Sequence, residues 1–161
     1  MRKQAASTGR PDDKSTALGD LNRCNSTALR KATRRVSQLY DSVLAPTGLR
    51  STQRSILLNI ARFESPTMGQ LAASLVLDRS ALGHNLKPLE RDGLVALEVD
   101  PEDRRNRRAK LTQQGQIKLR ETAGLWEIAQ TRFEHKFGVE TARALRETLA
   151  LIAAEDFDEG L

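Results

Sequence analysis

Apolar residues recur every three or four positions along most of this sequence, and the spacing changes to alternation in one stretch. The helical spacing is clear from Leu29 to Val43 and in the segments that begin at Ser51 and Thr112. The exception is residues 94–111, where two short runs of strand-forming residues flank a polar connection. The pattern predicts a mainly helical chain with a short β-hairpin.

Capping residues define two short helices just before that hairpin. Thr67 with Gln70 three residues on forms a capping box, which predicts a helix that begins at about Met68. Asp78 is a suitable N-cap for the next helix, which ends near Gly93. So few residues connect the two helices that they must pack at a steep angle, as in a helix-turn-helix.

The second helix of this pair has a polar face. Leu82, Leu86 and Leu89 share a stripe that we expect to face the core, and Pro88 is expected to bend the helix without ending it. The opposite stripe consists of Arg79, Ser80, Gly83, His84 and Lys87. Such side chains reach base edges or phosphates when a helix enters the major groove. Taken alone, this stripe is equally consistent with a solvated surface.

The connection between the two strands is strongly basic, because five of the seven residues from Arg104 to Lys110 are Arg or Lys. A hairpin directly after a helix-turn-helix is a wing, and arginines at its tip fit the negative potential of the minor groove. We expect Asp103 to hold the Arg105 guanidinium by a bidentate bond before DNA arrives. The residues expected to contact DNA from the wing are Asp103, Arg104, Arg105, Arg107 and Arg108.

Charge is distributed unevenly along the chain. Residues 1–120 contain 22 Lys and Arg against 12 Asp and Glu, whereas residues 121–161 contain 4 against 9. The basic part should therefore meet an anion. Aromatic residues make up only 4% of the chain, too few for a platform that stacks single-stranded bases, so double-stranded DNA is the expected partner. The absence of a long apolar run or an apolar signal segment predicts a cytoplasmic protein without membrane contact.

Residues that perform chemistry are sparse. The one cysteine, Cys24, and the two histidines leave too few ligands for a nitrogen-and-sulfur metal site. His84 and His135 lie on separate predicted helices without nucleophilic or acidic partners in the sequence. We therefore expect no metal, no cofactor and no enzymatic activity. The alternative from another class is a helical adaptor whose basic stretch binds RNA or an acidic protein.

The segment LERDGLVALEVDPEDRRNRRAKLTQQG resembles the wing signature of the multiple-antibiotic-resistance regulator (MarR) family. In that signature a Leu-Glu-x-x-Gly-Leu segment leads to Asp-x-x-Asp-x-Arg and then to a Leu-Thr-x-x-Gly helix start. The matching residues are Leu89, Glu90, Gly93, Leu94, Asp100, Asp103, Arg105, Leu111, Thr112 and Gly115. A looser resemblance covers residues 21–155. It implies a winged helix-turn-helix homodimer that binds palindromic promoter DNA, usually as a repressor, and releases it when a small ligand or oxidant binds.

The resemblance and the apolar pattern together predict how the chain is organised. Residues 1–20 are expected to form a flexible N-terminal arm, and residues 21–161 a single MarR-type domain. Its winged helix-turn-helix covers about residues 51–111, and helices at about 21–45 and 112–157 form a helical dimerisation region. The last two helices have more apolar surface than one pair can cover, which favours a homodimer over a monomer.

Two kinds of effector site are predicted. Tyr40, Phe63 and Trp126 are candidate walls of a pocket for a small molecule, although such aromatic residues also serve in a core. Cys24 lies near the start of the first long helix, where the helix dipole and Arg23 favour a thiolate. The resemblance implies peroxide sensing through this region in some members, which place tyrosines beside the cysteine; this sequence has one tyrosine, Tyr40.

Overall fold

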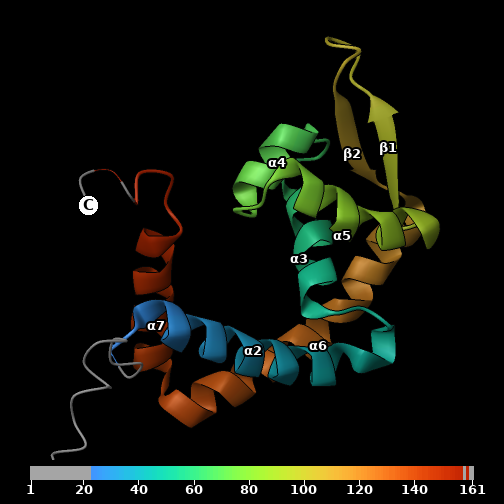
Figure 1. Ribbon diagram of the computed structural model, residues 1–161. Helices are drawn as coiled ribbons and strands as arrows, with labels where there is room; N and C mark the ends of the chain where they lie inside the picture. Colours follow the sequence, from blue (N-terminus) through green and yellow to red (C-terminus); the bar gives the residue numbers. More distant parts are fainter. Residues whose placement is uncertain (1–22, 158, 160–161) are drawn as a thin grey trace, which may run out of the picture. The chain divides into compact units, whose positions relative to one another are not determined.

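The computed structural model describes residues 23–157 and 159, and these residues form the predicted mainly helical fold with a β-hairpin (Figure 1). The helices end close to the predicted breakers and caps. In chain order, the elements are α2 (Asn25–Leu44), the 3-10 helix η1 (Ala45–Thr47), α3 (Ser51–Arg62), α4 (Met68–Ser74), α5 (Arg79–Arg91), β1 (Val95–Val99), β2 (Arg107–Leu111), α6 (Gln113–Phe137) and α7 (Val139–Ile152).

Contacts within the chain define two compact units, residues 1–36 and residues 37–161. Of the first unit the structure describes residues 23–36, and residues 25–36 form the N-terminal part of α2. The arm predicted for residues 1–20 lies outside the described residues. The second unit contains the C-terminal part of α2 and every later element.

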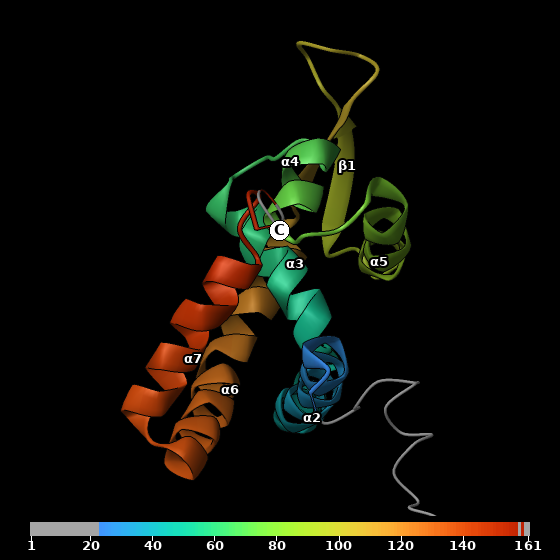
Figure 2. The same ribbon diagram turned by 60° about the vertical axis from the view of Figure 1, so that its left-hand side comes forward.

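Helices α3, α4 and α5 and the hairpin enclose an apolar core in the second unit (Figures 1 and 2). Leu82, Leu86 and Leu89 of α5 are fully buried, as their spacing predicts. The other buried members of this core are Leu49, Ile56, Leu57, Ile60, Leu71, Ala72, Leu94, Val95 and Ala109. Because each helix turns its apolar stripe inward, the polar face of α5 remains at the surface.

Helices α4 and α5 form the predicted helix-turn-helix, and both predicted caps are present. The Thr67 hydroxyl accepts a hydrogen bond from the Gln70 backbone N–H (3.2 Å), and the Gln70 side chain accepts one from the Thr67 N–H (2.9 Å). The Asp78 carboxylate accepts from the Ala81 N–H at 2.7 Å. In the turn between the helices, Val76 has a φ of 52°. A β-branched residue in this left-handed region is strained.

The hairpin is antiparallel, with a register that runs from Val95 opposite Leu111 to Val99 opposite Arg107. Residues 100–106 lie outside this ladder and form what we call the wing tip, which extends beyond the helices in both views (Figures 1 and 2). At its base, β2 is also joined to the segment that precedes α4. The Ala109 N–H donates to the Pro66 carbonyl at 2.9 Å.

The start of α6 is fixed against the hairpin by the predicted N-cap, Thr112. Its hydroxyl accepts a hydrogen bond from the Gly115 N–H (3.0 Å) and donates one to the Gly93 carbonyl (2.6 Å). Gly93 has a φ of 69°, which is the left-handed conformation expected after α5. Helix α6 thereby leads directly out of the winged lobe.

Helices α6 and α7 pack side by side and keep a large apolar surface exposed (Figure 2). Leu151 is 73% exposed and Val139 is 59% exposed. Other large apolar residues exposed on these helices are Ile117, Ile128, Phe137, Leu145 and Leu149. Within residues 23–157 and 159, no helix has both the length and the apolar character needed to cross a membrane.

Candidate nucleic-acid interface

The polar stripe of α5 is at the surface, where the sequence predicts it. Arg79, Ser80, His84 and Lys87 are all exposed. Gly83 lies among them, and a β-carbon built on it would have no atom within 4 Å. This part of the helix is therefore narrow and basic, and its four polar side chains stay exposed among residues 23–157 and 159. A slim helix of this kind can approach the floor of the major groove.

The support beneath this stripe is rigid. Three buried leucines hold the opposite face of α5, and the Asp78 cap holds its first turn. Pro88 lies inside the helix, which continues to Arg91. The prediction that Pro88 does not end the helix is therefore confirmed, and the exposed residues up to Lys87 share one continuous helical surface.

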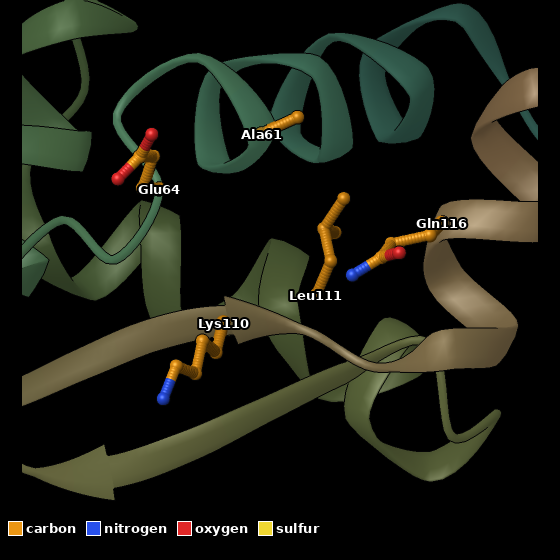
Figure 3. Close-up of a pocket in the computed structure, with 5 residues that line it drawn as sticks. All are labelled: Ala61, Glu64, Lys110, Leu111 and Gln116. Atoms are coloured by element: carbon orange, nitrogen blue, oxygen red, sulfur yellow. The ribbon is translucent and has the colours of Figure 1, made fainter.

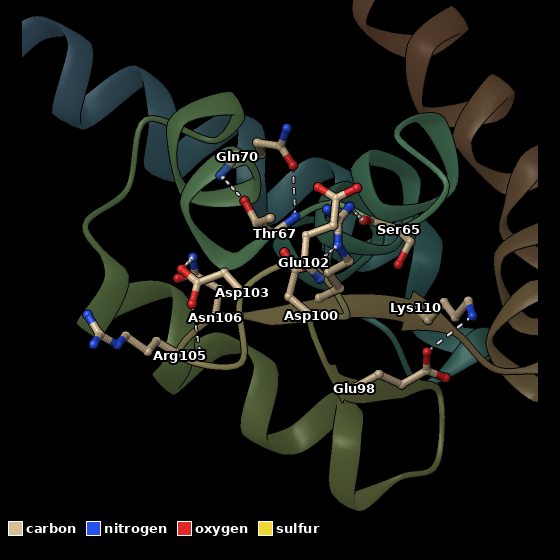
Figure 4. Close-up of polar contacts among 11 residues, drawn as sticks. Ser65, Thr67, Gln70, Glu98, Asp100, Glu102, Asp103, Arg105, Asn106 and Lys110 are labelled. Carbon is tan, nitrogen blue, oxygen red and sulfur yellow. Dashed lines mark hydrogen bonds and ion pairs between the residues drawn. The ribbon is translucent and has the colours of Figure 1, made fainter.

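The wing tip is ordered by Asp103, although not by the bond that the sequence predicts. The Asp103 carboxylate accepts hydrogen bonds from the backbone N–H of Arg105 (3.0 Å) and from the side-chain amide of Asn106 (2.9 Å) (Figure 4). It thus acts as the acceptor of a tight turn, because an Asp side chain readily bonds an amide two residues on. Asp103 fixes the backbone of Arg105 and leaves its guanidinium in solvent.

The basic residues of the wing differ in exposure. Arg104, Arg105 and Arg107 are exposed and can reach a phosphate or a groove. The side chain of Arg108 is only 29% exposed, and its Nε lies 3.0 Å from Asp100 Oδ1. Arg108 is therefore engaged within the protein, whereas the sequence groups it with the DNA contacts. Its neighbour in sequence, Arg107, points away because successive residues of a strand face opposite sides.

Asp100 is the more enclosed partner of this ion pair, with a side chain that is 5% exposed. The Arg108 guanidinium lowers the pKa of the Asp100 carboxyl, and the backbone N–H of Glu102, which donates to the same carboxylate at 3.1 Å, adds to this effect. In turn, Asp100 raises the pKa of Arg108. Both groups are therefore held in their charged forms.

Arg108 also reaches the other side of the wing base. Its Nη1 donates a hydrogen bond to the Ser65 carbonyl at 3.1 Å. Ser65 and Asp100 belong to the same cluster of polar contacts in Figure 4. We call Asp100, Arg108 and Ser65 the wing clamp, because the three residues join the wing tip to the segment that precedes α4.

Of the residues proposed for a ligand pocket, the structure brings Tyr40 and Trp126 close to one cation, Arg54. The Arg54 guanidinium carbon lies 5.1 Å from the centroid of the Trp126 ring, and Arg54 Nε donates to the Thr122 hydroxyl at 3.0 Å. Burial lowers the pKa of Arg54, whereas the nearby Glu127 and, to a smaller extent, Tyr40 act to raise it. The sequence pattern did not single out Arg54. A charged residue three positions before the buried Leu57 lies on the same face of the helix, which is a recognisable signal of a partly buried charge.

The Tyr40 hydroxyl is used within the protein. It donates to Gln130 Oε1 at 2.7 Å, and Gln130 Nε2 donates to Glu134 Oε1 at 2.8 Å. Burial raises the pKa of Tyr40, and the negative charge of Glu134 raises it further. Tyr40 is therefore a neutral donor at the junction of α2 and α6.

Phe63 lies elsewhere, at the C-terminal end of α3, and its side chain is 46% exposed. It borders a depression of about 460 Å³ beside the wing clamp. The residues that line this depression are Phe63, Ser65, Gln70, Ala73, Ser74, Arg108 and Glu155. The three aromatic candidates therefore do not form one pocket, because Phe63 and the Arg54 cluster lie at opposite ends of α3.

A second depression, of about 340 Å³, lies where α3, β2 and α6 meet (Figure 3). Ala61, Glu64, Lys110, Leu111 and Gln116 line it. The Lys110 ammonium is 3.1 Å from the Glu98 carboxylate, so the cation nearest to this depression is already paired. Among the described residues, no group of three or more His, Cys, Asp or Glu side chains could hold a metal ion.

Cys24 lies in the first unit, one residue before α2 begins. The Thr27 hydroxyl is 3.3 Å from the sulfur, and the Thr27 backbone N–H is 3.5 Å from it. These hydrogen bonds, the side-chain one first, lower the pKa of the Cys24 thiol. The cause is therefore chiefly hydrogen bonding from Thr27, whereas the sequence argument relied on the helix dipole and Arg23.

Comparison with known proteins identifies the family. A model of the MarR family matches residues 47–106. The transcriptional regulator MosR of M. tuberculosis, solved in complex with DNA, is 33% identical over 81% of this chain and 94% of that chain, with a TM-score of 0.74. The chain therefore belongs to the MarR family of winged helix-turn-helix transcriptional regulators, as its wing signature indicates.

Two structures of the transcriptional repressor CouR are also similar to this chain. One, bound to a 23-mer DNA duplex, is 28% identical over 85% of this chain and 97% of that chain, with a TM-score of 0.75. The other is CouR from Rhodococcus jostii RHA1 bound to p-coumaroyl-CoA. It is 25% identical over 86% of this chain and 98% of that chain, with a TM-score of 0.72. The similarity thus extends well beyond the wing.

Proposed function

We propose that this MarR-family regulator acts in the cytoplasm as a homodimer that represses palindromic promoters and is released from them by a small ligand. The observation that supports it is the pairing of two exposed basic elements on one lobe: the narrow face of α5 and the arginines of the wing tip. MosR and CouR, which are similar over most of their length, have both been solved on DNA. A helix in the major groove would read bases, while the wing contacts backbone and minor groove.

The test separates these two elements. His84→Ala should weaken binding to the preferred operator by roughly 1 to 3 kcal/mol and affect random duplex much less, because a lost base contact removes discrimination. Arg107→Ala should weaken binding to both duplexes equally and reduce the slope of log affinity against log salt by about one. The operator is first selected from a random duplex pool, and affinities are then measured by fluorescence anisotropy. Equal affinity of the parent for operator, random duplex and RNA would contradict the proposal.

The homodimer is supported by the exposed apolar surface of α6 and α7. A monomer that left Leu145 (42% exposed) and Leu149 (39% exposed), one turn apart on the same face of α7, in water would present an apolar patch. We expect an interface of more than about 2,000 Å² in total. Leu145→Glu should produce monomers in sedimentation experiments, while Glu147→Gln, on the opposite face of α7, should not. A parent protein that is monomeric at micromolar concentration would refute this assembly.

An effector site is supported by the cluster around Arg54. Among the described residues, no carboxylate forms an ion pair with Arg54, although its guanidinium is partly buried beside Trp126. A planar aromatic carboxylate could pair with that guanidinium, whose pKa Glu127 acts to raise without forming an ion pair. Trp126 is the one tryptophan of the chain, so its fluorescence reports directly on this cluster. Aromatic carboxylates should quench it and release DNA in the parent, but not in Arg54→Met; Arg120→Met serves as the control.

Oxidation of Cys24 is a second candidate trigger, favoured by its two hydrogen bonds from Thr27. Sulfenic acid formation requires thiolate, which a lowered pKa supplies. Treatment with cumene hydroperoxide should add oxygen to Cys24 in the mass spectrum and weaken DNA binding, and Cys24→Ser should abolish both effects. An unmodified Cys24 with unchanged DNA affinity would end this hypothesis.

A further inference from the structure

Arg107 and Arg108 are adjacent and identical in type, yet the fold gives them different surroundings. Arg107 is exposed at the end of the strand ladder, opposite Val99. Arg108 lies inside the base of the wing, with its guanidinium between a carboxylate and a backbone carbonyl. The planar fork of an arginine suits such a bridge, because its nitrogens are fixed relative to one another.

The two ends of this bridge belong to different parts of the DNA-binding lobe. Asp100 is the first residue of the wing tip, where its own N–H donates to the Asn106 carbonyl at 3.0 Å and closes the loop. Ser65 is followed by the buried Pro66 and by Thr67, the N-cap of α4. The bridge therefore connects the wing tip directly to the start of the helix-turn-helix.

A two-stranded hairpin has little stability of its own. Without a side contact, the wing tip would adopt many orientations relative to α5, and binding to DNA would have to select one of them. Restricting that motion before DNA arrives lowers the ordering cost of binding. The wing clamp supplies the restriction at the point where the hairpin leaves the lobe, beside the short pairing of Arg108 with Thr67.

We infer that Arg108 is a positioning residue, which together with Asp100 and Ser65 orients the wing for DNA, and that it is not itself a phosphate ligand. This inference rests on the proposed DNA-binding function. It makes an unusual prediction for Asp100: removal of a negative charge next to the DNA-binding surface should weaken DNA binding, whereas simple electrostatics requires the opposite.

The experiment measures operator affinity over a salt series for Asp100→Asn, Arg108→Gln and the double variant. Asn at position 100 retains an oxygen for the Glu102 N–H, so this variant removes the charge and keeps the turn. Each single variant should lower operator affinity about tenfold. The double variant should bind the operator no more weakly than the single variant of lower affinity, because the two residues act as one unit. The salt slope should stay within about 0.5 of the parent value.

Arg107→Ala is the matched control, since it removes an identical charge one residue away. It should reduce the salt slope by about one and leave the wing of the free protein unchanged. Hydrogen exchange in free protein is the second readout: amides of residues 100–109 should exchange faster in both clamp variants and at the parental rate in Arg107→Ala. Arg108→Lys should restore part of the protection because it retains the charge.

Tighter DNA binding by Asp100→Asn would overturn the inference. So would an Arg108→Gln variant whose salt slope falls by about one while its amide exchange stays at the parental rate. Either result would make Arg108 a phosphate contact. Unchanged affinity in both clamp variants would also overturn it. A parent with no preference for duplex DNA would instead refute the proposed function, and the exchange measurements on the free protein would still report whether the clamp orders the wing.

Discussion

Gly115 lies so close to Leu94 that a β-carbon at position 115 would overlap the Leu94 carbonyl oxygen. This contact holds the first turn of α6 against the hairpin, next to the Thr112 cap. Because the obstructing atom is backbone, no side-chain rotation can relieve the overlap. Gly115→Ala should therefore destabilise the protein by about 2 kcal/mol or more, as measured by chemical denaturation.

Gly124 provides the control on the same helix. A β-carbon there would meet no atom within 4 Å, so Gly124→Ala should stabilise the protein by about 0.5 to 1 kcal/mol through the higher helix propensity of alanine. Equal effects of the two substitutions would show that the close packing of α6 on Leu94 is not present in solution.

Val76 should be replaceable by glycine with a gain in stability. Its φ of 52° is unfavourable for a β-branched residue, and its side chain is 70% exposed, so little packing is lost. The left-handed conformation costs an L-residue about 1 to 2 kcal/mol, which exceeds the entropy that glycine adds to the unfolded chain. Val76→Gly should raise the melting temperature, whereas Val76→Ala, which keeps the strain, should change it little. A lower melting temperature for Val76→Gly would contradict the strained turn.

Asp103 should tolerate asparagine better than alanine. Its carboxylate accepts from the Arg105 N–H and from Asn106, and an asparagine oxygen can replace the first of these acceptors. Asp103→Ala should therefore lower operator affinity more than Asp103→Asn does, in anisotropy titrations at constant salt. If Asp103 acted instead through its charge on the Arg105 guanidinium, as the sequence suggests, both variants would lose affinity equally.

Stability should depend on pH through Asp100. Its native pKa is lowered from the ordinary value of 3.8, chiefly by Arg108. A group whose pKa is lower in the folded state stabilises the fold above its unfolded pKa and loses this effect as the pH falls through the native value. The melting temperature of the parent should exceed that of Asp100→Asn near neutral pH, and the difference should shrink below the ordinary pKa of 3.8 and vanish once the pH is below the lowered native pKa. If the difference in melting temperature between the parent and Asp100→Asn persisted in acid, the substitution would act through packing and not through charge.

The features predicted correctly from sequence are those set by nearby residues. The Thr67–Gln70 capping box and the Asp78 and Thr112 caps each depend on atoms three residues apart. The buried leucines of α5 follow from helical spacing. Such short-range rules also predicted the hairpin and the exposed stripe of α5, and with them the winged helix-turn-helix.

The features that the sequence could not supply depend on distant partners. Strand alternation places Arg107 and Arg108 on opposite faces of the hairpin, but it does not say which face meets the protein, because that depends on Ser65, far earlier in the chain. The same holds for Arg54, which meets Trp126 only after α3 packs on α6. Tyr40, Phe63 and Trp126 share an aromatic character, but the length of α3 separates Phe63 from the other two.

The strand ladder ends at Val99 and Arg107, and the wing clamp pairs Asp100, just beyond the ladder, with Arg108, which lies inside the ladder opposite Glu98. The intervening loop, residues 101–106, is exposed apart from the half-buried Asn106 and contributes nothing to the apolar core. In the proposed function, the loop that would contact DNA is therefore largely separate from the part of the hairpin that contributes to the core. We therefore expect that loops of equal length can be grafted between these anchors without disturbing the lobe, which would make the wing a place to re-engineer the operator preference of such a regulator.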